Sequence, residues 1–185
     1  MSLRLAHTLV GGVGYYDLRD HSVGPALSEI LRAESWPEGI LVEDLSYGPV
    51  HVVQRLSDAR PPFRRLIVVG AVERGRAPGT IVAYRWDGAL PDTDEIQTRV
   101  VESLTGIVGL DNLLIVTAAL AAPAPVIFVV EVEPVVEALG DAFSAPVALA
   151  LPRAARLVRG IALDGLTVAS LRAGPLGGAA GGSTP

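Results

Sequence analysis

Apolar runs rich in Val and Ile alternate along this chain with amphipathic segments, and this alternation is what most restricts its fold. Continuous apolar runs are typical of parallel strands that are covered by helices on both faces. We expect buried strands at residues 5–13, 39–45, 65–72 and 126–132. The pattern predicts an α/β fold with three layers, α/β/α, and a mostly parallel sheet of about five strands.

A further strand is expected at residues 80–86, directly after the turn Ala77-Pro78-Gly79. Because a short turn precedes it, we expect this strand to form a hairpin with the strand before it. Open α/β sheets place their sites at the carboxyl ends of the strands. We therefore also expect the loops after the first and third strands to lie side by side.

Amphipathic periodicity predicts several helices between these strands. Ser22 is expected to cap the first helix, whose apolar stripe consists of Val23, Leu27, Ile30 and Leu31. A short helix is predicted at residues 49–56, and a helical region from the turn at 91–94 to about residue 120.

The end of the chain is harder to assign, because Pro152 lies inside an apolar pattern that spans residues 147–158. The last helix either begins near Pro152 or is kinked there.

With 185 residues, 50% of them hydrophobic, the chain suffices for one core and is too short for two. We expect a single domain at residues 1–172 and a disordered Gly/Ala-rich tail at residues 173–185.

Composition excludes several classes of function. The chain has no Cys, so it can form neither a disulfide, a thiolate nucleophile nor a zinc-thiolate site. Its net charge is −5 and no basic cluster is denser than Arg64-Arg65, so we expect no nucleic-acid partner. The long apolar stretch at 113–132 is interrupted by polar and Pro residues, and no secretory leader is apparent. These features predict a cytoplasmic protein without membrane contacts.

The Gly-rich turn Gly11-Gly12-Val13-Gly14 follows the first strand, as a dinucleotide-binding loop would. The position of that motif's third Gly is occupied by Asp17, whose charge would repel a pyrophosphate. We therefore expect no cofactor-binding residues here. The glycines are instead expected to mark a close approach between two backbone segments.

Six short segments carry a more specific signal through their order along the chain. They are GYYDLRDHSVGP at residues 14–25, EDLSYG at 43–48, RLIVVGAV at 65–72, APGTI at 77–81, Gly109-Leu110, and the strand end at 131–134. In this order they resemble the hydrogenase maturation protease family over residues 5 to about 160. No single segment is specific for this family. The loop with Asp and His at residues 17–21, the Pro-Gly-Thr turn at 78–80 and their order are specific only in combination.

The resemblance implies a phosphorylase/hydrolase-like fold. It also implies a metal-dependent peptidase that removes a C-terminal extension from a nickel-iron hydrogenase large subunit after nickel insertion. Three family ligands are implied: a carboxylate in the first loop, an Asp at the end of the third strand, and a His before the Gly-Leu helix. In this chain these positions fall on His21, Gly70 and Gly106. Glycine has no side-chain donor, so two of the three ligands are missing.

Other residues are candidate substitutes for the lost ligands. Asp17 or Asp20 could orient His21, Glu73 follows Gly70 by three residues, and Glu102 precedes Gly106 by one helical turn. Against them stands the simpler interpretation that His21 and Glu73 are surface residues, since a catalytic metal generally takes about three protein ligands.

Glu131 and Glu133 are interpreted as solvated strand ends. We expect no tightly bound cofactor, with nickel entering only with a substrate.

Two functions follow from the resemblance, and the catalytic residues stay unassigned. The first is a non-catalytic paralogue that binds a hydrogenase large subunit or a maturation factor. The alternative is an active endopeptidase that removes the C-terminal extension with a metal site rebuilt from His21, Asp20 and Glu73.

Overall fold

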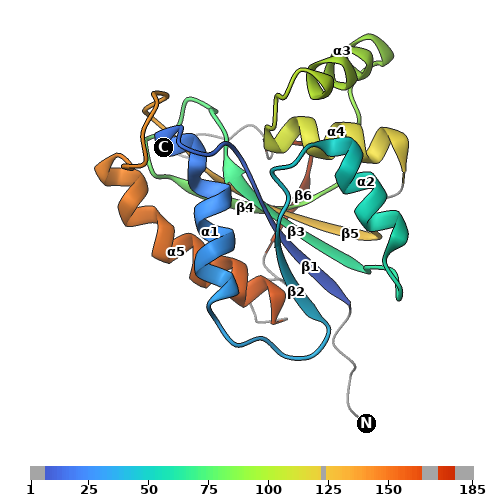
Figure 1. The fold of residues 1–185 in the computed structure, drawn as a ribbon, viewed down its shortest axis with the longest axis horizontal. Helices are drawn as coiled ribbons and strands as arrows, with labels where there is room; N and C mark the ends of the chain where they lie inside the picture. Colours follow the sequence, from blue (N-terminus) through green and yellow to red (C-terminus); the bar gives the residue numbers. More distant parts are fainter. Residues whose placement is uncertain (1–6, 122–123, 164–170, 178–185) are drawn as a thin grey trace.

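The computed structural model describes residues 7–121, 124–163 and 171–177. These residues form a six-stranded sheet in the order β2-β1-β3-β5-β4-β6 (Figure 1). The strands are β1 (Thr8–Val13), β2 (Ile40–Asp44), β3 (Arg65–Ala71), β4 (Ile81–Trp86), β5 (Val126–Val132) and β6 (Ala173–Gly174). Every pair is parallel except β4 with β5, so the predicted mostly parallel α/β sheet is confirmed.

Helices cover both faces of this sheet. They are the 3-10 turn η1 (Arg19–Ser22) and the helices α1 (Val23–Arg32), α2 (Pro49–Asp58), α3 (Thr93–Leu104), α4 (Leu110–Leu120) and α5 (Ala145–Ala162). The side chains of β3 alternate between the faces. Ile67 and Val69 pack in the core under α1 and α5, whereas Leu66 and Val68 pack in the core under α2 and α4. The three layers are therefore as predicted.

The first helix differs in detail from the prediction. Ser22 is its N-cap residue, but the side chain does not cap it, because the Ser22 hydroxyl accepts a hydrogen bond from the Leu18 N–H (3.0 Å). Val23, Leu27 and Leu31 are fully buried as expected. Ile30 lies at the edge of this stripe and is 40% exposed.

The expected hairpin between the third and fourth strands is wrong. β5 lies between β3 and β4 and pairs with both, in parallel with β3 and antiparallel with β4. β3 has β1 on its other edge, so no edge of β3 is left for β4. The segment between β3 and β4 therefore crosses the end of β5 instead of making a tight turn.

The predicted helical region up to residue 120 is two helices. The chain leaves α3 through Gly106, whose φ of +88° is a left-handed conformation that glycine adopts without strain. It enters α4 after Gly109, which is the N-cap. The last helix, α5, begins well before Pro152 and contains it as an exposed residue, so a start near Pro152 is wrong.

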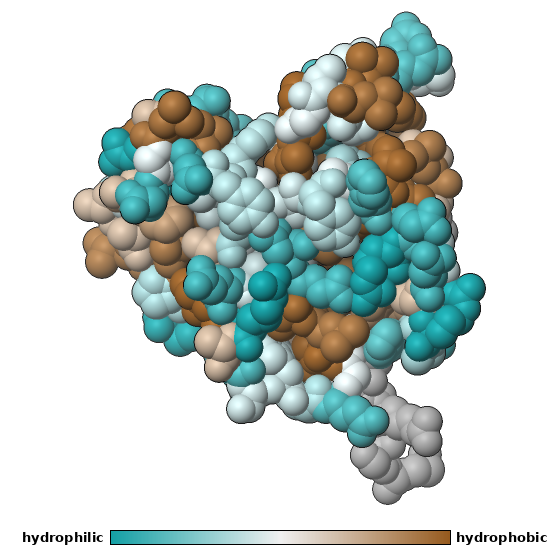
Figure 2. All heavy atoms as spheres, in the orientation of Figure 1, coloured by the Kyte–Doolittle hydropathy of each residue, from teal (hydrophilic) through white to brown (hydrophobic). Residues whose placement is uncertain are grey.

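Helix α3 stands apart from the sheet and packs on α4 (Figure 1). None of its residues, all of which the structure describes, is buried. Two of its apolar side chains are largely exposed, Val101 at 61% and Leu104 at 74%. Figure 2 shows apolar side chains gathered on the surface of this helix.

Part of the predicted tail is placed in the fold. Ala173 and Gly174 form β6, which pairs with Arg85 and Trp86 of β4. The prediction of disorder is therefore wrong for residues 173–177, and residues 178–185 lie outside the described part of the chain. No helix among the described residues is long and apolar enough to cross a membrane.

The loops after β1 and β3 leave the same end of the sheet. Val13, the last residue of β1, is in register with Gly70 near the end of β3. The two loops therefore start side by side, as predicted, and the site described below lies between them.

Candidate functional site

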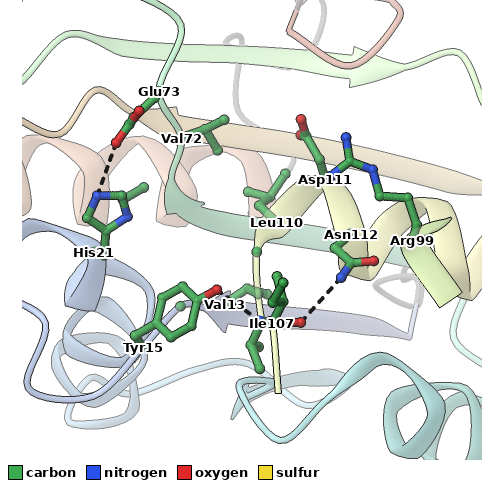
Figure 3. Close-up of a pocket in the computed structure, with 14 residues that line it drawn as sticks. Val13, Tyr15, His21, Val72, Glu73, Arg99, Ile107, Leu110, Asp111 and Asn112 are labelled. Carbon is green, nitrogen blue, oxygen red and sulfur yellow. Dashed lines mark hydrogen bonds and ion pairs between the residues drawn. The ribbon is translucent and has the colours of Figure 1, made fainter. Parts of the chain in front are cut away.

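A cavity of about 250 Å³ opens at the carboxyl ends of β1 and β3. Its wall consists of the loop after β1 with Tyr15 and His21, the loop after β3 with Glu73, and the entry to α4 with Ile107 and Asn112 (Figure 3). The Tyr15 hydroxyl accepts a hydrogen bond from the Val108 N–H (3.2 Å), which joins two of these walls. Ligand sites of open α/β sheets occur at this end of the strands.

His21 and Glu73 meet at one side of this cavity. The Nε2 atom of His21 lies 3.4 Å from Oε1 of Glu73, and the two side chains are 15% and 67% exposed. Glu137, in the loop after β5, joins them, so that one ligand atom from each of the three residues lies within 4.8 Å of the others. The structure thus brings together two predicted candidates, His21 and Glu73, with a third that sequence reasoning missed.

Glu137 could have been found from the sequence only if the strand order had been known. It follows β5, which is the neighbour of β3 in the sheet, and both strands end at the same edge. An acid shortly after β5 therefore has the same access to this edge as Glu73 has after β3.

Asp20 has a structural role rather than the predicted one beside His21. It is fully buried, and its carboxylate accepts hydrogen bonds from the N–H groups of Val135, Val136 and Ser144 and from the Ser144 hydroxyl. Burial raises the pKa of Asp20, but these hydrogen bonds outweigh burial and hold the pKa below its usual value. Asp20 therefore fastens the loop after β5 to the loop after β1, which positions Glu137 near His21.

The other two predicted substitutes do not reach His21. Asp17 is exposed, with φ of +55°, and its carbonyl accepts a hydrogen bond from the Gly140 N–H (2.8 Å). Glu102 pairs with Arg99 on α3 at 3.4 Å. Neither carboxylate belongs to the His21 cluster among the described residues.

The two glycines that the resemblance places at ligand positions differ in their surroundings. A Cβ added to Gly70 would lie 2.6 Å from the backbone oxygen of Val13, closer than real Cβ contacts. At Gly106, no described atom would lie within 4 Å of an added Cβ, and this residue is not part of the cavity wall. The residues present therefore do not fit the ligand set that the resemblance implies.

The Gly-rich turn is explained by close packing of backbones. A Cβ added to Gly12 would lie 2.0 Å from the Gly24 oxygen, and one added to Gly24 would lie 2.1 Å from the Val13 oxygen. The Gly12 N–H also donates to the hydroxyl of Ser28 on α1 (3.0 Å). These glycines let α1 approach β1, which supports the interpretation made from the sequence.

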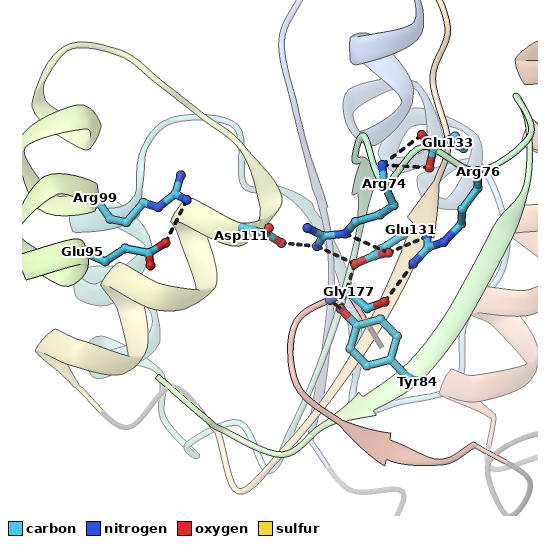
Figure 4. Close-up of polar contacts among 9 residues, drawn as sticks. All are labelled: Arg74, Arg76, Tyr84, Glu95, Arg99, Asp111, Glu131, Glu133 and Gly177. Carbon is cyan, nitrogen blue, oxygen red and sulfur yellow. Dashed lines mark hydrogen bonds and ion pairs between the residues drawn. The ribbon is translucent and has the colours of Figure 1, made fainter. Parts of the chain in front are cut away.

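A buried ionic network lies beside the cavity, and it corrects the prediction for Glu131 (Figure 4). Glu131 is fully buried and accepts from Arg74 (2.8 Å), Arg76 (2.7 Å) and the Tyr84 hydroxyl (2.8 Å). Burial raises its pKa, but its partners, with Arg74 the foremost, outweigh burial and hold the pKa below its usual value. Arg74 also pairs with Asp111 at the start of α4 (2.7 Å).

Glu133 is likewise not a solvated strand end. It is 3% exposed and accepts hydrogen bonds from the N–H groups of Arg74 and Gly75. Sequence reasoning missed this network, although two acids in an apolar strand and the pair Arg74 and Arg76 were a usable signal. Buried acids are seldom left without such partners.

Comparison with known proteins agrees with this architecture. No protein-family model and no curated protein matches the sequence. Among solved structures, the hydrogenase 2 maturation peptidase of a Thaumarchaeota archaeon is similar, with TM-score 0.60 and 22% identity over 85% of this chain and 97% of that one. The hydrogenase maturating endopeptidase HybD of E. coli has TM-score 0.63 and 18% identity over 85% and 93%.

The endopeptidase HycI of E. coli is also similar, with TM-score 0.59 and 21% identity over 83% of this chain and 90% of that one. The chain thus has the fold of the hydrogenase maturation endopeptidases, as the resemblance in sequence implied. The likeness extends over nearly the whole length of these proteins.

Proposed function

We propose that this chain is a non-catalytic paralogue of the hydrogenase maturation endopeptidases. It binds the C-terminal segment of a hydrogenase large subunit, or of another maturation protein, in the cytoplasm. The observation that carries this proposal is the state of the family ligand positions, where Gly70 and Gly106 offer no donor while the fold around them is kept.

The surroundings of Gly70 support the loss of the metal site that the resemblance implies. Gly70 is in register with Glu131 on the neighbouring strand, and parallel partners place their side chains on the same face. Glu131 already supplies a buried carboxylate at this level of the sheet, and Arg74 and Arg76 neutralise it. An Asp at position 70 would crowd the Val13 oxygen and add a second buried negative charge.

The cavity supports binding of a chain end. Its volume of about 250 Å³ is enough for one or two side chains of a peptide, and its wall mixes apolar Val13 and Leu110 with polar groups. Ile107 is 39% exposed at this wall, so a bound peptide would cover it.

Binding is tested with a synthetic peptide that spans the end of the large-subunit precursor from the same organism. The wild type should bind it, and Ile107→Gln should weaken binding roughly tenfold, as expected for a partly buried contact residue. The matched control is Ile30→Gln, because Ile30 has almost the same exposure, 40%, but lies on α1. No binding by the wild type, or equal losses in both variants, would contradict the proposal.

The second candidate is an active endopeptidase with a rebuilt metal site. The convergence of His21, Glu73 and Glu137 favours it, because a catalytic metal generally takes about three protein ligands. This candidate requires cleavage of the precursor, which binding of a peptide alone does not show.

A further inference from the structure

Helix α4 begins at the cavity with an uncapped end. Its N-cap is Gly109, no side-chain hydrogen bond caps it within the described chain, and residues 107–112 line the cavity. Among the described residues, no atom accepts a hydrogen bond from the N–H groups of Leu110, Asp111 and Asn112. Unpaired N–H groups at the start of a helix, together with the helix dipole, favour an anion.

This end of the helix faces open space. A Cβ added to Gly109 would meet no described atom within 4 Å. The cavity of about 250 Å³ in front of it is large enough for the last residue of a peptide.

The side chain of Asn112 provides an observation independent of the helix end. Asn112 is 2% exposed and lines the cavity. Its Nδ2 donates to the Ile107 oxygen (3.3 Å), and its Oδ1 is buried without a hydrogen-bond partner among the described residues (Figure 3). Buried acceptors without a donor are uncommon in folded proteins. An N–H group of a ligand would supply the missing donor.

The charges near the start of α4 permit an anion there. Asp111, the acid of the first turn, is neutralised by Arg74 (2.7 Å). Arg99, which two acids of its own helix partly neutralise, also lines the cavity. Glu73, the other acid of the wall, lies beside His21, on the side of the cavity away from α4 (Figure 3). The helix dipole is therefore not cancelled by an unpaired acid beside it.

We propose that the start of α4 binds the free C-terminus of a peptide chain. The terminal carboxylate accepts hydrogen bonds from the N–H groups of the first turn of α4. The backbone N–H of the last peptide residue donates to Oδ1 of Asn112. The carboxylate and the N–H of one residue are separated by only a few covalent bonds, and their partners here belong to one helical turn.

This recognition deepens the proposed function and rests on it for the identity of the bound chain. Capture of a terminal carboxylate by backbone N–H groups is one of the recurring modes of peptide recognition. It specifies that the partner presents a free chain end to the cavity rather than an internal segment. An internal segment has the N–H groups but lacks the carboxylate, so amidation of a peptide end separates the two.

Isothermal titration calorimetry on the full chain tests this with the precursor peptide in two forms, one with a free C-terminal carboxylate and one with a C-terminal amide. The free acid should bind roughly tenfold or more tightly than the amide, because it alone makes charge-assisted hydrogen bonds. A preference of this kind does not depend on any substitution, so it is measured on the wild type.

Asn112→Asp tests the residue itself. It keeps the size of the side chain but places a negative charge beside the bound carboxylate, so the preference for the free acid should be lost. A variant that merely loosens the fold would weaken both forms of the peptide alike. The matched control is Gln97→Glu, the same change of amide to carboxylate on an exposed residue of α3 outside the cavity wall, and it should keep the preference.

A second probe does not depend on the partner. Heteronuclear NMR of the labelled wild type follows titration with N-acetylalanine, which has one amide N–H and one carboxylate, and with its uncharged amide. The acid should shift the backbone signals of residues 110–112 and the side-chain amide signal of Asn112. The uncharged analogue should leave these signals in place.

The outcomes separate this proposal from the proposed function. Equal binding of the two peptide forms would overturn the carboxylate site and leave the proposed function standing. Binding of N-acetylalanine at α4 without binding of either precursor peptide would overturn the proposed function alone. A preference that survives in Asn112→Asp, or the absence of acid-specific shifts at residues 110–112 with both the peptide and N-acetylalanine, would also overturn the carboxylate site.

Discussion

Gly70 lies between Val13 of β1 and Glu131 of β5, in register with both. A methyl group on this residue would be 2.6 Å from the Val13 oxygen, and that oxygen belongs to the backbone of a central strand. The space at this point of the sheet is therefore set by the strand pairing itself, and it cannot be enlarged by turning a side chain.

Gly70→Ala should consequently lower the free energy of unfolding by about 2 kcal/mol, the usual range for overpacking in a core. Gly109→Ala is the control, because no described atom lies within 4 Å of a Cβ placed there. Urea unfolding followed by circular dichroism measures both variants. Equal stabilities of the two variants would contradict this account, because they would show that β1 and β3 move apart at Val13 without cost.

Glu131 is the second residue whose role can be measured directly. Replacing it by Gln leaves Arg74 and Arg76 without their buried counter-charge, so Glu131→Gln should destabilise the fold by roughly 3 kcal/mol at neutral pH. The folded-state pKa of Glu131 lies below its usual value. Its charge therefore contributes fully above the unfolded-state pKa, and that contribution is lost as pH falls through the folded-state pKa.

The stability difference between wild type and Glu131→Gln should therefore shrink as the pH is lowered below the usual carboxyl range. Urea unfolding at a series of pH values gives this difference. Because Gln does not titrate, the variant itself is the reference. A difference that stays constant down to the acid limit of folding would refute the ionic role of Glu131.

Among the elements, α3 is the one least attached to the core. It packs on α4, none of its described residues is buried, and Leu104 is 74% exposed. In contrast, α4 buries Leu110, Leu113 and most of its other residues. Segments with few buried contacts open with a small free energy.

Hydrogen exchange should therefore be much faster in α3 than in α4. Mass spectrometry of peptides covering residues 93–104 and 110–120 measures this in one experiment. A peptide partner that covers the exposed apolar side chains of α3 should slow its exchange. Equal protection of the two helices in the isolated protein would contradict this description of α3.

The elements also show how far the sequence alone could lead. The strands β3 and β5 were predicted because burial on both faces makes them continuous apolar runs, a local signal. The pairing of β4 with β5 was not, because register and strand order depend on residues far apart in the chain. The break at Gly106 was missed because apolar periodicity continues on both sides of it.

The same distinction holds for the candidate site. His21 was found because its position in a loop motif is local, and Glu73 because it is close to Gly70 in sequence. Glu137 and the arginine partners of Glu131 come from other loops, and only the folded chain brings them together. The buried role of Asp20 was missed because its four hydrogen bonds run to residues 135–144.

At the scale of the whole molecule, the chain has the fold of the maturation endopeptidases and a cavity at the carboxyl ends of β1 and β3. The sheet and its two helical layers match the maturation endopeptidases over most of their length. Two of the three ligand positions that the resemblance implies hold glycine, at residues 70 and 106. We therefore expect that this chain binds its partner but does not cleave it.

The most direct measurement is the intact mass of a nickel-loaded large-subunit precursor from the same organism after incubation with this protein. A maturation endopeptidase with its own substrate serves as the positive control. We predict that the two proteins form a complex on a gel-filtration column and that the precursor keeps its full mass. Loss of the C-terminal extension in the presence of the wild type would contradict the account and establish the active endopeptidase instead.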